Sequence, residues 1–87
     1  GGGGRITLSG AIDEILATHR VLVGPGTSSG DLGFLPEGCI VEEQHAARQT
    51  TLLVDRPVGP LPEGWTASDP SLDDVVLAHL RAGKAKP

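Results

Sequence analysis

CIVEEQHAARQTTLLVD, residues 39–55, contains two short β-forming runs that are separated by a very short link. The runs, residues 39–46 and 48–55, are rich in Ile, Val, Leu and Thr, which fit the pleated surface of a sheet. Two such runs so close together predict an antiparallel hairpin. Glu42 and Glu43 would point to opposite faces of their strand, which favours solvated surface over a catalytic carboxylate pair.

Three further strands are predicted outside the hairpin. Residues 5–9 alternate apolar and polar side chains and predict a short strand that Gly10 ends. Residues 20–24 are compact and β-branched and predict a second strand, and residues 65–69 predict the last one.

Two helices are predicted by apolar residues at helical spacing. The first covers residues 11–18, with two acidic residues, Asp13 and Glu14, in its first turn. The second begins after Ser71, which forms a capping box with Asp74, and Gly83 is expected to stop it. Its apolar stripe consists of Leu72, Val75, Val76 and Leu80.

The segments between these elements are rich in Gly and Pro. Residues 25–38 predict a loop, and residues 56–64, with three prolines, predict irregular backbone. The sequence LPEG occurs at residues 35–38 and again at residues 61–64. Proline near the start and glycine at the end favour a type I turn. The repeat therefore predicts that two strands are entered in the same way.

These elements predict one α+β domain. Its core would be a small, mostly antiparallel sheet of four to five strands with two helices on one face, related to the split βαβ plan. A chain of 87 residues buries only ~60% of the surface that it exposes when unfolded, so the core is modest.

Composition excludes several classes of function. The net charge is −4 and Phe34 and Trp65 are the only aromatic residues, which argues against nucleic-acid binding. No apolar run approaches the ~20 residues that span a bilayer, so no membrane insertion is expected. The single Cys39 excludes an internal disulfide framework. A soluble cytosolic domain is the expectation.

No motif in the chain predicts catalysis or nucleotide binding. The glycine-rich residues 24–31 lack the lysine of a phosphate-binding loop. Residues 26–30 match G-x-S-x-G, with Ser28 in the position of a nucleophile. That motif needs a strand-to-helix turn on a large sheet, and neither is expected here. A surface loop is the favoured interpretation, and no catalytic or cofactor-binding residue is predicted.

The histidines and Cys39 match no zinc-binding spacing, so no metal ligand is predicted. His19 and His79 each fall on the apolar face of a helix, which favours half-buried histidines at the edge of the core. Trp65 is expected in the core first and at an interface second. The residues proposed for an interface or a ligand contact are Trp65, Leu72, Val76, His79 and Leu80.

Three stretches resemble one protein family. Residues 5–16, RITLSGAIDEIL, resemble the passage after the switch histidine of ABC-transporter ATP-binding subunits, where a strand leads into a helix. Residues 71–80, SLDDVVLAHL, resemble the closing helix of export-type subunits whose permease is a separate polypeptide. Residues 18–25, THRVLVGP, are similar to a linking segment of a multidrug-export branch found in actinobacteria.

The resemblance implies that the chain is the C-terminal accessory region of such a subunit. Residues 1–4 would be a linker or cloning remnant, residues 5–18 the end of the ATPase domain, residues 19–83 the accessory domain and residues 84–87 a flexible tail. The ATPase motifs would all precede Arg5, so this chain itself would hold neither ATP nor magnesium.

The parent protein, by the same resemblance, hydrolyses ATP with magnesium and drives export. The chain would have the rest of that subunit as its partner, and a permease through it, at the inner face of the cell membrane. A homodimer is a further expected arrangement.

Regulation or dimerisation of the ATPase subunit is the preferred function. A small-molecule-sensing module is the alternative, with its site at residues 24–30 and a cleft near Trp65. A hydrolase that uses Ser28 is a distant third.

Overall fold

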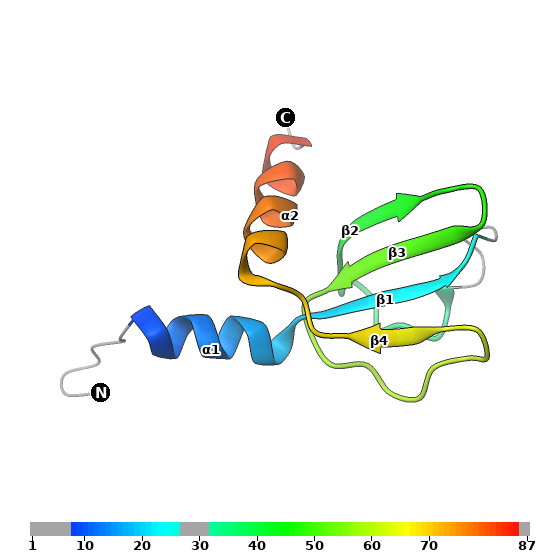
Figure 1. Ribbon diagram of the computed structural model, residues 1–87, viewed down its shortest axis with the longest axis horizontal. Helices are drawn as coiled ribbons and strands as arrows, with labels where there is room; N and C mark the ends of the chain where they lie inside the picture. The colour runs from blue at the N-terminus through cyan, green and yellow to red at the C-terminus, as the bar shows by residue number, and fades with distance from the viewer. Residues whose placement is uncertain (1–7, 27–31, 86–87) are drawn as a thin grey trace.

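The computed structural model describes residues 8–26 and 32–85 and contains a four-stranded open sheet with one helix before it and one after it (Figure 1). All neighbouring strands are antiparallel, and their order across the sheet is β2-β3-β1-β4. The predicted α+β class is therefore confirmed. The elements are α1 (Leu8–Thr18), β1 (Arg20–Pro25), β2 (Ile40–His45), β3 (Gln49–Val54), β4 (Thr66–Ser68) and α2 (Leu72–Ala85).

The predicted hairpin is formed by β2 and β3. Ala46 donates its backbone N–H to the Gln49 carbonyl at 2.8 Å and closes the link between them. The register shifts between Ile40 and Glu42, which marks a β-bulge. Such a bulge sets two residues opposite one. As a result, consecutive residues Val41 and Glu42 both lie on the face that α2 covers.

The two helices share one hydrophobic cluster on one face of the sheet, as predicted. Val75 and Ala78 of α2 form a buried cluster with Leu53 of β3, and Ile15 and Leu16 of α1 pack against this cluster. Beyond these contacts α1 extends away from the sheet (Figure 1).

The opposite face is covered by the irregular segments. Leu22, Leu52 and Val54 from the two central strands are fully buried there. Residues of the two crossover connections pack against them, among them Phe34, Leu35, Val58 and Leu61. In the described part of the chain no α-helix lies between two strands. The relation to the split βαβ plan is therefore limited to β1 and β3, each of which lies between two strands that run the same way.

The two LPEG segments form matching turns. Cys39 N–H donates to the Pro36 carbonyl at 3.4 Å, and Trp65 N–H donates to the Pro62 carbonyl at 3.2 Å. Gly38 and Gly64 have φ of 78° and 91°. Positive φ at the third position of a turn is typical of type II, so the predicted type I turn is wrong. The prediction assumed that glycine is the fourth residue of the turn, whereas it is the third.

The repeat does introduce two core residues in the same way. Cys39 and Trp65, each directly after a turn glycine, belong to one buried cluster on the loop-covered face. Trp65 is only 9% exposed and lies beside Phe34, with ring centroids 5.3 Å apart. The first expectation for Trp65, a core position, is confirmed.

The predicted bounds of both helices differ from the structure, whereas the four described strands agree with prediction to within one residue at each end. Leu8 and Ser9, assigned to a strand, begin α1, and Gly10 lies inside it, so Asp13 and Glu14 are not in the first turn. Leu8 precedes Ile12 by four residues, so the helical spacing extends to Leu8 and outweighs a five-residue alternation. The rest of the predicted strand, residues 5–7, lies outside the described residues, as do residues 1–4.

At the other end, α2 continues through Gly83 to Ala85, into the predicted tail, whose last two residues are not described. A glycine costs a helix only about 1 kcal/mol, so it does not oblige the helix to stop.

Local caps fix both helices. Ser71 Oγ accepts the Asp74 N–H at 3.1 Å, so the predicted N-cap is confirmed. At the end of α1, the Arg20 guanidinium donates to the Ala17 and His19 carbonyls at 2.9 and 2.8 Å. A cation in this place satisfies carbonyls that lack helical partners and suits the helix dipole.

Gly24 of β1 is required by its contact with Trp65. A Cβ at this position would overlap the indole ring, whereas a Cβ at Gly59 would meet no atom within 4 Å. We therefore expect Gly24→Ala to lower the free energy of unfolding by ~1–3 kcal/mol, because the packed core must shift. Gly59→Ala is the control and should stay within about 0.5 kcal/mol of the original protein in urea unfolding. Equal stability of the two variants would contradict the packing described here.

Candidate functional site

An apolar groove of about 500 Å³ lies between α1 and α2. We call it the histidine groove. No Asp, Glu, Lys or Arg lines it. Its lining residues are Ile15, His19, Val75, Val76, His79 and Leu80.

Two histidines meet in the groove. His19 Nε2 and His79 Nε2 lie 3.0 Å apart although the residues are 60 positions apart in the chain. The rings meet edge to face, with centroids 5.2 Å apart and planes at 71°. Both histidines were predicted to be half-buried. His19 is instead buried, at 7% exposed, and His79 is exposed, so this prediction is wrong for both rings.

The hydrogen-bond roles in this pair follow from one neighbour. His19 Nδ1 lies 2.8 Å from the Ile15 carbonyl, and a carbonyl oxygen only accepts, so Nδ1 carries the proton. In neutral His19 the Nε2 atom is then a bare acceptor. His79 Nε2–H must donate to it.

Exposed aliphatic side chains border the pair. Val76 is 46% exposed and Leu80 is 58% exposed on α2. Apolar side chains of this size remain in water only at a cost of up to ~1.5–3 kcal/mol each relative to full burial. A contiguous group of them around a groove is typical of a contact surface.

The groove contains three of the five residues proposed from sequence, namely Val76, His79 and Leu80. Leu72 is half-buried on the same helix but does not line the groove, and Trp65 lies in the core on the opposite face. Sequence reasoning missed the contribution of α1. The shared placement of His19 and His79 on apolar helix faces was the one signal that could have joined them.

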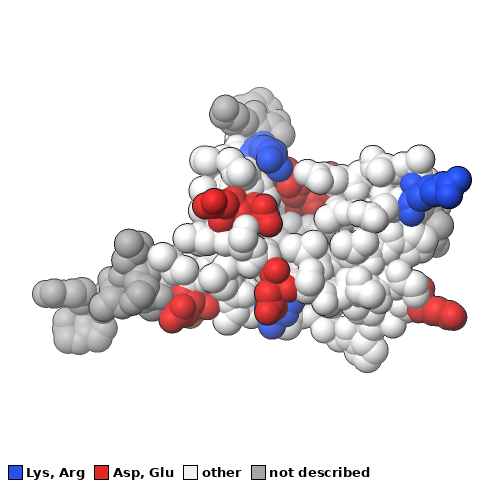
Figure 2. Space-filling view, viewed as in Figure 1, with Lys and Arg blue, Asp and Glu red and all other residues white. Residues whose placement is uncertain are grey.

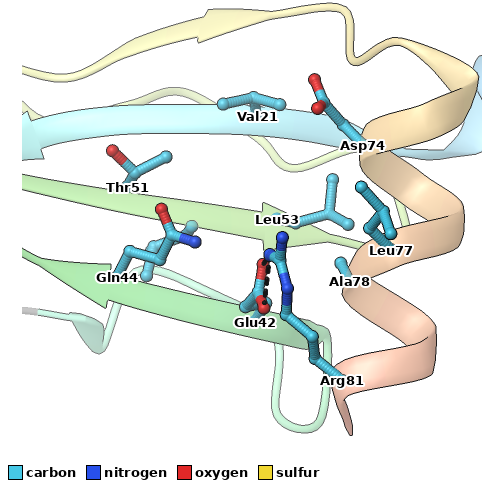
Figure 3. Close-up of a pocket in the computed structure, with 10 residues that line it drawn as sticks. Val21, Glu42, Gln44, Thr51, Leu53, Asp74, Leu77, Ala78 and Arg81 are labelled. Atoms are coloured by element: carbon cyan, nitrogen blue, oxygen red, sulfur yellow. Dashed lines mark hydrogen bonds and ion pairs between the residues drawn. The ribbon is translucent and has the colours of Figure 1, made fainter.

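A second cavity, of about 260 Å³, lies between α2 and the helix-covered face of the sheet (Figure 3). We call it the sheet pocket. Arg81 of α2 donates from Nη1 to both carboxylate oxygens of Glu42, at 3.0 and 3.1 Å. Glu42 is thus a paired residue at the edge of a cavity, not free surface as predicted. The pocket is lined by Val21, Glu42, Gln44, Thr51, Leu52, Leu53, Asp74, Leu77, Ala78 and Arg81.

Among the described residues, no group with a shifted pKa lines either cavity. Burial raises the pKa of the Cys39 thiol, so this cysteine is a protonated core residue and not a nucleophile. A 2.8 Å hydrogen bond from Arg56 Nε lowers the pKa of Asp55. Both shifts are accounted for by packing and local pairing.

Glu43 and His45 share the other face of β2. Glu43 accepts a hydrogen bond from His45 Nε2 at 2.8 Å, and Thr50 Oγ1 lies 3.3 Å from His45 Nδ1. Glu43 therefore points away from Glu42, as predicted. The carboxylates do not form a pair.

Other predicted features fall outside these cavities. Ser28 and the rest of the G-x-S-x-G match lie largely outside the described residues. Neither cavity is lined by Trp65, whose ring is packed against Phe34 and over Gly24. The cleft expected beside Trp65 is therefore neither of these two cavities.

Charged side chains are scattered over the face seen in Figure 2, without a continuous basic patch. Within residues 8–26 and 32–85, no three His, Cys, Asp or Glu side chains are grouped so that they could hold a metal ion. Neither helix of the described chain is long and apolar enough to cross a membrane.

Comparisons with protein-family models, with curated proteins and with solved structures find no match to this chain. Its own surface and its local sequence patterns are therefore the basis for a functional proposal.

The hydrogen-bond geometry predicts opposite tautomers for two neutral histidines. His19 should carry its proton on Nδ1, because it donates to Ile15, and His45 should carry it on Nε2, because it donates to Glu43. Long-range ¹H–¹⁵N correlation spectra of the ring nitrogens distinguish the two forms directly. Finding His19 protonated at Nε2 would contradict the arrangement of the groove.

Proposed function

We propose that this chain is a non-catalytic regulatory and dimerisation domain at the C-terminal end of an ABC-transporter ATP-binding subunit. The parent would bind and hydrolyse ATP with magnesium and drive export through a membrane permease. The domain would then lie in the cytoplasm, at the inner face of the cell membrane, through its parent.

The observation that carries the proposal is the histidine groove. It is apolar, carries no charged lining residue and has Val76 and Leu80 exposed at its border. Such a surface gains free energy when another protein surface covers it. An uncharged surface also meets a second copy of itself without like-charge repulsion, which suits a symmetric dimer.

The position of the groove supports the link to an ATPase. One of its walls is α1, which overlaps residues 5–16, the stretch that resembles the end of the ATPase domain. The other wall is α2, which contains all but the first residue of 71–80, the stretch that resembles the closing helix of export-type subunits. Both patterns of resemblance therefore meet at one surface.

A small-molecule-sensing role has one observation in its favour, the sheet pocket. Its 260 Å³ is slightly below the range of ~300–1,000 Å³ that is usual for ligand sites. Two of its charged residues, Arg81 and Glu42, are already hydrogen-bonded to each other. A bound ligand would have to replace that pair, so this role ranks second.

Two exposed leucines on α2 allow the histidine groove and the sheet pocket to be tested separately. Leu80 lines the histidine groove, and Leu77, 47% exposed, lines the sheet pocket. We expect Leu80→Glu to weaken self-association by about 10–100-fold, the loss that corresponds to one buried leucine. Leu77→Glu is the matched control and should leave association unchanged. Sedimentation equilibrium of the chain measures both.

Equal effects of the two substitutions would refute the role of the groove. The same pair of variants in the intact ATP-binding subunit tests the wider proposal. Leu80→Glu should alter the concentration dependence of ATPase activity there, whereas Leu77→Glu should not. Nucleotide turnover by the isolated 87-residue chain would contradict the proposal directly.

A further inference from the structure

We propose that His19 and His79 form half of a zinc site, which a second copy of the chain completes with the same two residues. This deepens the proposed dimerisation role and rests on it for the second pair of ligands. It names the ion that would control the association.

The first argument is the distance between the two ring nitrogens. Two nitrogens bound to tetrahedral zinc at ~2.0–2.1 Å lie roughly 3.3–3.4 Å apart. His19 Nε2 and His79 Nε2 lie 3.0 Å apart, so the two atoms need to move apart by only a few tenths of an ångström to bind the ion. His79 is exposed on α2, where its side chain has room to make this adjustment.

The second argument is the orientation of His19. Histidines that bind metals usually donate their other ring N–H to a carbonyl or carboxylate, which fixes the ring. His19 Nδ1 makes this bond to the Ile15 carbonyl at 2.8 Å. Its Nε2 lone pair is thereby held toward His79 in the absence of any metal.

The two neutral histidines keep the same number of protons when zinc binds. His79 moves its ring proton from Nε2 to Nδ1, which leaves both Nε2 atoms unprotonated and able to bind the ion. Imidazole nitrogen favours zinc and related transition metals, whereas magnesium and calcium require oxygen ligands.

The third argument concerns the missing ligands. Zinc takes four, and the described residues of one chain offer no group of three His, Cys, Asp or Glu side chains at any place. A two-fold axis through the groove would bring two identical pairs together and give four imidazoles. Ile15, Val75, Val76 and Leu80 would then surround the ion and exclude water.

Zinc titration of the tag-free chain tests the proposal. Calorimetry should give one zinc per two chains, and light scattering should show a shift from monomer to dimer as zinc is added. At hundredfold excess over its dissociation constant, zinc that binds only the dimer strengthens association by about 100-fold. Magnesium should have no such effect.

Substitutions identify the ligands. His79→Ala should weaken zinc binding by roughly 100-fold or more, because loss of even an outer-shell partner costs about 10–100-fold. His45→Ala is the control, since His45 is an exposed histidine that bonds to Glu43 instead. The exposure of His79 makes unfolding of the variant unexpected, and circular dichroism checks this.

The outcomes separate this inference from the proposed function. Zinc binding that is unaffected by His79→Ala, or that leaves the chain monomeric, would overturn the shared site. Metal-independent association that Leu80→Glu disrupts, with no zinc uptake, would overturn it too, but would leave the dimerisation role intact. Loss of zinc-dependent dimers in His79→Ala alone supports it.

Discussion

The ring of Trp65 lies over Gly24 on the central strand β1, and much of the structure depends on this contact. The indole joins the segment before β4 to the centre of the sheet, where Leu22 and Leu52 are fully buried. With only two aromatic residues in the chain, no other side chain could cover as much of this face. Two type II turns deliver Trp65 and Cys39 into the same cluster, so both crossover connections are fixed to one core.

This arrangement leaves the two faces of the sheet with different roles. Irregular segments cover one face, and the polar groups with shifted pKa values there are paired or buried. Helix α2 packs on the other face and α1 packs against α2, and only part of the apolar surface of the two helices is buried there. Val75 and Ala78 enter the core, whereas Val76 and Leu80 remain exposed beside the histidine pair. The surface proposed for dimerisation is this exposed part of the apolar stripe.

Most of the fold followed from local sequence patterns, and the differences have physical causes. The hairpin and the cap at Ser71 depend on neighbouring residues, so the sequence predicts them well. The recurrence of the LPEG turns was also predicted, but their type was not. The start of α1 was misplaced because the alternation over residues 5–9 predicted a strand, although Leu8 also lies at helical spacing from Ile12. Gly83 did not stop α2, since its cost is small. The contact of His19 with His79 spans 60 positions and depends on how α1 and α2 meet, which no local pattern encodes.

Side-chain accessibility in the assembled state tests the central claim, that the histidine groove is covered by a partner protein. Hydroxyl-radical footprinting reports it residue by residue, for the chain alone at low concentration and for the assembled ATP-binding subunit. We expect Val76, His79 and Leu80 to react in the isolated chain and to be protected in the assembly, while Leu77 reacts equally in both. Undiminished labelling of the groove in the assembly would contradict the account.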